Sequence, residues 1–306
     1  MNEAASLVAS MMSASTPLLL AALGIAISEK SGVVNLGVEG MMLVAAVVAF
    51  GVTHASGHHA LGFVAGAAVG ALMATLFALL ALGLATNQYA TGLALALFGA
   101  GLSAFIGQPL QGLSLPARTG DGIGWLRDLP WLGTAFFSQH WLVYASLGLA
   151  AGVAWFLQRS RAGLVLRAVG ESPESAHALG YPVQWIRYFA LIFGGACAGL
   201  AGAFISTIYT PLWSEGMVAG RGWIALALVT FATWRPGRIV LGAYLFGGMT
   251  MLQFYLQGAG IAVPPEFLAM APYLATIVVL ALISRNPRWI RLNMPASLGK
   301  PFDRAV

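Results

Sequence analysis

Continuous apolar stretches dominate the chain, and several reach the roughly 20 residues that an α-helix needs to cross about 30 Å of hydrocarbon. Asp, Glu, Lys and Arg make up only 8% of the 306 residues, whereas soluble globular domains carry about 25%. With a mean hydropathy of +0.82, a compact fold could not cover its surface with polar groups. Because the stretches lack the strict alternation of barrel strands, we predict an all-α integral membrane protein.

The apolar stretches predict about nine transmembrane helices in a single membrane domain over residues 1–306, with eight or ten as alternatives. The glycine-rich segments 37–40 and 216–222 could instead be broken or re-entrant. The predicted spans are 4–27, 38–53, 60–85, 88–107, 141–157, 187–209, 218–234, 239–257 and 267–284.

The distribution of positive charge predicts the topology. The chain has 15 Lys and Arg and 10 Asp and Glu. In a soluble protein this excess of positive charge would suggest binding to nucleic acid, but here it indicates the positive-inside bias of a membrane protein. We therefore expect no nucleic-acid partner. A cytoplasmic C-terminus and an external N-terminus place twelve of these cations inside. The predicted external loop is then 107–140, and the predicted cytoplasmic segments are 158–187 and the tail 285–306.

Several sequence features argue against chemistry within the chain. Residues 24–31, GIAISEKS, nearly match a phosphate-binding loop, but Glu29 replaces the second glycine and no strand precedes it. The lone Cys197 excludes an internal disulfide, and the histidines of the turn at 54–59 lack nearby carboxylates. We therefore expect no ATPase activity, no catalytic residue, no metal and no cofactor in this chain.

The predicted cytoplasmic loop contains signals for a helix of about two turns. Ser172 is a helix N-cap residue and Pro173 follows at the first helical position. Gly180 supplies the C-terminal stop, with Pro182 just beyond. Because so short a helix is marginal alone, we expect it to pack into a partner; a connector lying on the membrane surface is the alternative.

The segment GLVLRAVGESPESAHALGY is similar to the coupling loop of permease subunits in ATP-binding-cassette (ABC) importers of the branched-chain amino acid, simple sugar and nucleoside superfamily. The resemblance implies that the short helix inserts into a cleft on a separate cytoplasmic ATPase, which holds the ATP and Mg²⁺. The residues that match this coupling pattern are Arg167, Glu171, Pro173, Ala176, Gly180 and Tyr181.

Other segments resemble one branch of that superfamily, the second permease subunit of nucleoside importers. They are residues 28–43, 87–105 and 217–247, the stretch APYLATIVVLA and the terminal LGKPF. Where that branch has Phe–Gly–x–Trp, this chain has Ala232, and a methyl group there would prevent the closest backbone approach.

The resemblance implies a multi-pass permease of the bacterial inner membrane, acting with a companion permease as a heterodimer and with an extracytoplasmic binding lipoprotein. The implied substrate is a nucleoside. A permease for simple sugars or branched-chain amino acids is an alternative, as is an ion-coupled secondary transporter.

Two charges lie at or inside the ends of glycine-rich spans, Glu39 in GVEGMMLVAA and Arg221 in AGRGWIALAL. A charge at depth costs roughly 2.5–3.5 kcal/mol and usually faces a cavity or a partner; the alternative is a boundary charge that reaches interfacial water. The two related segments run in opposite predicted directions, which suggests an inverted repeat with the substrate path at its interface.

Neutral polar residues are the other candidates for the substrate path. Asn35, Asn87 and Gln88 could donate and accept hydrogen bonds with ribose and base, and Trp223 could offer a stacking face. The alternative for each is a bond that joins helix to helix.

Overall fold

The computed structural model describes residues 2–116, 122, 124–258, 264, 267, 270, 274, 277–278 and 293–302, and this part of the chain is almost entirely helical. The α-helices are α1 (Asn2–Lys30), α2 (Val38–Ser56), α3 (His59–Ala78), α4 (Gln88–Gly107), α5 (Trp141–Arg159), α6 (Arg161–Glu171), α7 (Pro173–Ala178), α8 (Val183–Phe204), α9 (Arg221–Phe231) and α10 (Pro236–Gly258). Short 3-10 helices cover Gln108–Leu110 and Gly124–Asp128, and π-helical turns cover Leu79–Gly83, Gly133–Phe137 and Ile205–Tyr209.

Seven helices of the described residues are long and apolar enough to cross a membrane. They correspond to seven of the nine predicted spans, so the all-α membrane fold is confirmed. The predicted span 218–234 contains only α9, whose 11 residues cover about 16 Å at 1.5 Å per residue, about half of the hydrocarbon thickness. The structure therefore favours the re-entrant alternative there. The predicted span 267–284 lies mostly outside the described residues.

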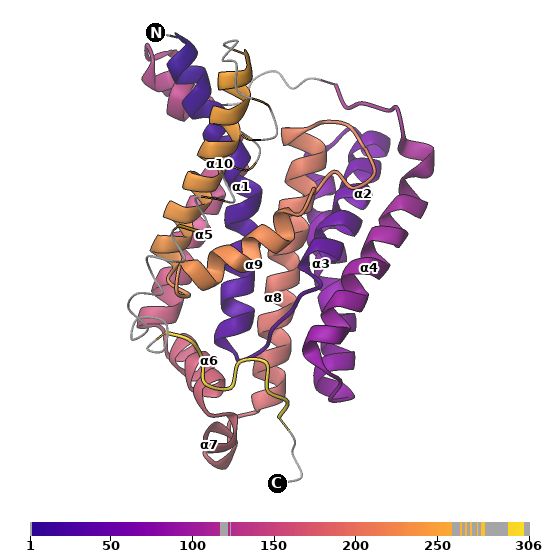
Figure 1. Cartoon of the computed structure of the whole chain (residues 1–306), viewed down its shortest axis with the longest axis vertical. Helices are drawn as coiled ribbons and strands as arrows, with labels where there is room; N and C mark the ends of the chain where they lie inside the picture. Colours follow the sequence, from indigo (N-terminus) through magenta and orange to yellow (C-terminus); the bar gives the residue numbers. More distant parts are fainter. Residues whose placement is uncertain are drawn as a thin grey trace.

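Helix α1 runs through the middle of the bundle, between α5 and α10 on one side and α8 on the other (Figure 1). Glycines allow the nearby pair α3 and α8 to pack with their backbones almost in contact. A Cβ atom at Gly70 would lie 2.2 Å from the carbonyl oxygen of Gly195, and one at Gly199 would lie 2.2 Å from that of Gly66. Helices in lipid associate through such small residues because van der Waals packing replaces the hydrophobic effect.

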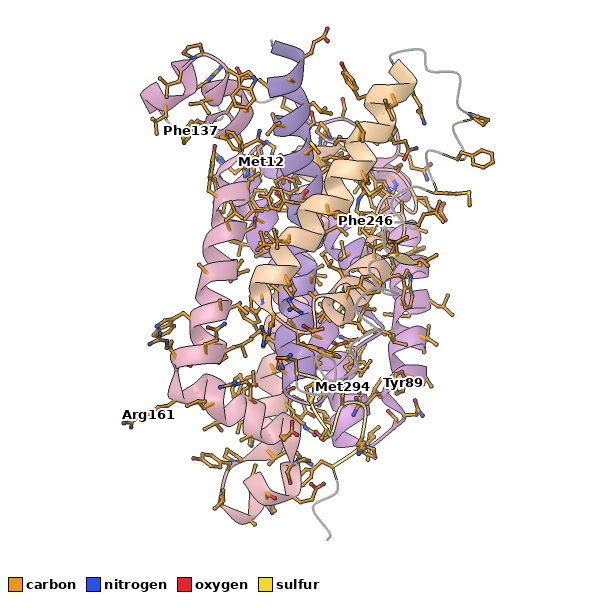
Figure 2. The ribbon with its side chains drawn as sticks, turned by 60° about the vertical axis from the view of Figure 1, so that its left-hand side comes forward. Met12, Tyr89, Phe137, Arg161, Phe246 and Met294 are labelled. Carbon is orange, nitrogen blue, oxygen red and sulfur yellow. The ribbon has the colours of Figure 1, made fainter. Side chains whose placement is uncertain are left out.

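The N-terminus lies at one end of the bundle, and α6, α7 and residues 293–302 lie at the other (Figure 1). We call the latter the α7 end. Figure 2 likewise places Arg161 near the α7 end and Phe137 toward the opposite end. Lys30 Nζ donates to the backbone oxygen of Asn293, and Arg235 Nε donates to its Oδ1 at 3.5 Å. The described segments that were predicted to be cytoplasmic thus share one end of the molecule.

Candidate functional site

The segment before α2 enters the bundle without forming a helix. Residues 31–35 are all buried between Lys30, where α1 ends, and Val38, where α2 begins. Asn35 Oδ1 accepts a hydrogen bond from the backbone N–H of Gly37 at 2.9 Å, and Asn35 is only 5% exposed. This short-range bond turns the chain into α2, so the Asn35 side chain serves the local backbone.

Glu39, in the first turn of α2, joins the N-termini of two helices. Its Oε1 accepts from the backbone N–H of Gly220 at 2.8 Å, and its Oε2 accepts from that of Gly222 at 2.7 Å. These amides belong to the N-terminus of α9, where unpaired N–H groups and the helix dipole favour an anion. The carboxylate thus satisfies groups that would otherwise be unpaired inside the bundle.

Glycines are needed on both sides of this contact. Gly220 has φ +79°, a left-handed conformation that glycine adopts without strain. A Cβ atom at Gly222 would lie 2.7 Å from the Cα atom of Glu39. Behind Glu39, a Cβ atom at Gly40 would lie 2.6 Å from the backbone oxygen of Leu95 in α4. The α2–α9 junction, defined here as Glu39 with residues 220–223, is therefore built by close backbone approach.

Arg221 and Trp223 lie at the same junction. Arg221 Nη1 donates to the backbone oxygens of Met217 and Val218 at 3.2 Å each, and its guanidinium carbon lies 5.3 Å from the ring centroid of Tyr209. Trp223 is 38% exposed. Of the predicted path residues, the structure thus brings together Glu39, Arg221 and Trp223.

Asn87 and Gln88 lie elsewhere, at the start of α4. Asn87 caps that helix, because its Oδ1 accepts from the N–H groups of Tyr89 and Ala90 at 3.0 and 3.1 Å. Gln88 is 2% exposed, and its Oε1 accepts from Val34 N at 2.9 Å. Gln88, the first residue of α4, lies about two helical turns from Leu95, a residue of α4 that contacts Gly40. The amides of these two side chains hold the backbone in the structure.

The short helix in the inner loop forms as predicted. Helix α7 begins after Ser172, whose hydroxyl accepts from Ser175 N at 3.3 Å, and Pro173 occupies its first position. Gly180 follows the helix with φ +86°, which only glycine adopts readily. The local N-cap, proline and glycine signals were sufficient to place this element.

Some of the predicted coupling residues are buried within the protein, and the others are exposed. Pro173 is buried, and Ala176 is 3% exposed because it packs against Val169 and Val183. In this conformation the protein itself covers the Ala176 side chain, and its contact with a partner stays a prediction. Exposed positions at the end of α7 are Leu179 at 77% and Tyr181 at 41%.

Sequence reasoning missed helix α6, which precedes α7. Ser160 caps it by accepting from Gly163 N at 2.9 Å. Arg167 and Glu171 are both exposed on α6. The signal was available, because Ser160 followed by buried Gly163, Leu166 and Val169 has the three-residue spacing of an amphipathic helix.

Sequence reasoning also missed a contact between α1 and the segment after α9. Trp234 Nε1 donates to Glu29 Oε2 at 2.6 Å, and both residues are buried. Thr233 and Trp234 have φ of +50° and +54°, and Arg238 Nη1 donates to Thr233 Oγ1 at 2.9 Å. Ala232 has φ −69°, so its conformation does not require the glycine of the resembling branch. A carboxylate only two residues beyond the predicted span 4–27 was the available signal for Glu29.

Comparison with known proteins gives a family match and several relatives. Residues 7–284 match the family described as "Branched-chain amino acid transport system / permease component". The chain is 42% identical to a putative glucose ABC transporter permease, TsgC13, of Haloferax volcanii, with all of both chains covered. It is 35% identical to the nucleoside ABC transporter permease NupC of Lactococcus lactis, covering 90% of this chain and 91% of the relative.

The chain is also 31% identical to the guanosine ABC transporter permease NupQ of Bacillus subtilis, with 94% of this chain and 92% of the relative covered. No solved structure gave a significant match.

Proposed function

The chain belongs to the permease family of the branched-chain amino acid transport system, whose members are membrane components of ABC transporters, and we propose that it forms the path by which nucleosides enter the cell. It is a multi-pass protein of the bacterial inner membrane. This family assignment replaces the ion-coupled secondary transporter that the sequence left open.

The observation that carries the proposed path is the α2–α9 junction. Helices α2 and α9 both begin inside the bundle. The Glu39 carboxylate in α2 accepts from two backbone amides at the start of α9, at 2.7 and 2.8 Å. Helix N-termini that meet inside a membrane protein, with charged and aromatic side chains beside them, are typical of transporter substrate sites. Arg221 and Trp223 would then offer a nucleoside hydrogen-bond donors and a stacking face.

Helix α7 supports the proposed coupling to ATP hydrolysis. It lies at the end of the molecule that carries the predicted cytoplasmic segments, and Leu179 and Tyr181, which follow it directly, are exposed. A large exposed apolar side chain outside the membrane is suited to an interface with a partner. We propose that an ATPase subunit, which supplies ATP and Mg²⁺, binds this face, and that a companion permease and a binding lipoprotein complete the importer.

The relatives support two substrate classes. Two relatives are named for nucleoside or guanosine transport, at 35% and 31% identity, and the relative at 42% identity is named a putative glucose permease. A sugar is therefore the second candidate, because both classes present ring hydroxyl groups. The exposed ring of Trp223 favours the nucleoside, since every base has a face on which an aromatic side chain can stack.

The test is uptake of radiolabelled guanosine by proteoliposomes that contain the chain, its ATPase, its companion permease and a binding protein. We expect ATP-dependent uptake that other nucleosides compete for and that glucose and leucine do not. ATP-dependent uptake of radiolabelled glucose, with no uptake of guanosine, would establish the sugar alternative. Uptake driven by an ion gradient in the absence of the ATPase would contradict the coupling mechanism.

A further inference from the structure

Residues 293–302 cross the α7 end of the molecule and bind three separate elements. Ser297 donates twice to the backbone oxygen of Gly170 in α6, from N at 3.1 Å and from Oγ at 2.6 Å. Gly299 N donates to Gly32 O at 3.1 Å, and Gln88 Nε2 of α4 donates to Lys300 O at 3.4 Å. We call this segment, drawn in yellow in Figure 1, the C-terminal strap.

Arg187 of α8 binds the C-terminal strap. It lies in the second turn of α8 and is 0% exposed. Its Nε donates to Ser31 O and its Nη2 donates to Ser297 Oγ, both at 3.1 Å. The guanidinium carbon also lies 6.0 Å from the ring centroid of Phe302. One buried cation thus joins α8, the segment before α2 and the strap.

One hydrogen-bond donor of the Arg187 guanidinium has no partner within the described part of the chain in this conformation. Its Nη1 is buried and has no hydrogen-bond partner among the described residues. A buried donor without a partner costs free energy, and a buried charge is tolerated only when its hydrogen bonds compensate for lost hydration. This donor is therefore available for a further hydrogen bond if the strap changes position.

The strap connects the proposed ATPase-binding helix to the segment that leads to the α2–α9 junction. On one side, the ring of Phe302 lies 5.7 Å from that of His177 in α7. On the other side, Gly299 binds Gly32, six residues before the start of α2. A displacement of α7 would therefore reach the segment before Glu39 through a continuous set of contacts.

We propose that the C-terminal strap transmits the movement of α7 to residues 31–37, with Arg187 as the positioning residue that keeps the strap on both. This inference rests on the proposed function, because it takes α7 as the helix that the ATPase moves. A static brace would show the same contacts at rest, but it would not change position during the ATP cycle.

The first test removes one hydroxyl. Ser297→Ala deletes both the Oγ bond to Gly170 and the acceptor for Arg187. The matched control is Ser56→Ala, a serine at the opposite end whose Oγ bonds only to nearby backbone: it donates to Val52 O at 2.6 Å and accepts from His58 N at 3.2 Å. In the reconstituted importer we expect Ser297→Ala to retain the ATPase but to transport at least about tenfold less solute per ATP, because the lost bond to the charged Arg187 alone corresponds to a factor of that size or larger.

Ser297→Thr, which restores the hydroxyl, should recover the ratio of transport to hydrolysis, and Ser56→Ala should not change it. An unchanged ratio in Ser297→Ala would overturn the strap proposal. A wild-type complex that binds no ATPase or transports no solute would instead contradict the proposed function.

A second measurement does not depend on the Ser297 variant. In a Cys197→Ala background, spin labels at Lys300→Cys on the strap and Leu97→Cys on the exposed face of α4, which is 76% exposed, report the distance between strap and bundle. We expect that distance to change when the ATPase is trapped with a non-hydrolysable ATP analogue. The same distance distribution with and without nucleotide would identify a static brace and overturn the proposal.

Discussion

Replacing Glu39 with glutamine should release the N-terminus of α9 from α2. The two carboxylate oxygens accept from Gly220 N and Gly222 N at 2.8 and 2.7 Å. Glutamine has the same shape but only one acceptor oxygen, and its NH₂ group would face the other N–H. One hydrogen bond to a charged group is lost, which corresponds to about 1.5–3 kcal/mol.

That free energy predicts a measurable change in local opening. Since each 1.4 kcal/mol is a factor of ten, the anchored state should lose about 10- to 150-fold in its equilibrium against the released state. Amide hydrogen exchange reports such local opening directly. We expect the amides of Gly220 and Gly222 to exchange faster by this factor in Glu39→Gln, measured in nanodiscs on peptides that cover 215–231.

Glu215→Gln is the matched control, because Glu215 is an exposed acid in the same loop. It should leave the exchange at residues 220–222 unchanged. Exchange in Glu39→Gln that equals the wild type would refute the inference that the carboxylate anchors α9. Equal acceleration in both variants would refute it as well, because the effect would then come from loop charge alone.

Three further predictions concern packing, docking and the Glu29–Trp234 bond. Gly70→Leu should lower the melting temperature of the purified protein, because the new Cβ atom would lie 2.2 Å from a backbone oxygen and overpacking costs about 1–3 kcal/mol; Gly101→Leu, where a Cβ atom meets nothing within 4 Å, should not. Leu179→Asp should abolish co-purification of the ATPase without changing membrane insertion, since Leu179 is 77% exposed; retained binding would contradict the assignment of this face. Trp234→Phe should destabilise the protein by about 1–3 kcal/mol by removing the indole donor from the buried Glu29, and a double-mutant cycle with Glu29→Gln that shows purely additive losses would contradict it.

Local signals in the sequence predicted the local structure. Hydropathy placed the seven spans because crossing a bilayer requires a continuous apolar segment, and the cap, proline and glycine around 172–180 placed α7. The same rules could have identified Asn87 as the N-cap of α4. A polar side chain at a helix start was instead interpreted as a candidate for the substrate path.

Contacts between distant segments could not be predicted from such signals. Glu39 binds amides about 180 residues away, and Ser297 bonds to Arg187 from 110 residues away; neither pairing leaves a pattern in the local sequence. Which face of α7 is exposed also depends on its neighbours, because Val169 and Val183 cover Ala176. The sequence identified Glu39 and Arg221 as unusual, and only the structure shows that they belong to one junction.

The most direct test of the proposed substrate path is thiol labelling at the α2–α9 junction. Cys197 is the only cysteine and is 3% exposed, so a Cys197→Ala background that carries Trp223→Cys contains one reactive site. We expect a water-soluble thiol reagent to label this cysteine in the assembled importer, and a guanosine-loaded binding protein with ATP to slow the reaction. Labelling no faster than at Phe105→Cys, a 71% exposed position on the apolar surface of α4, and unaffected by guanosine, would contradict a path through the junction.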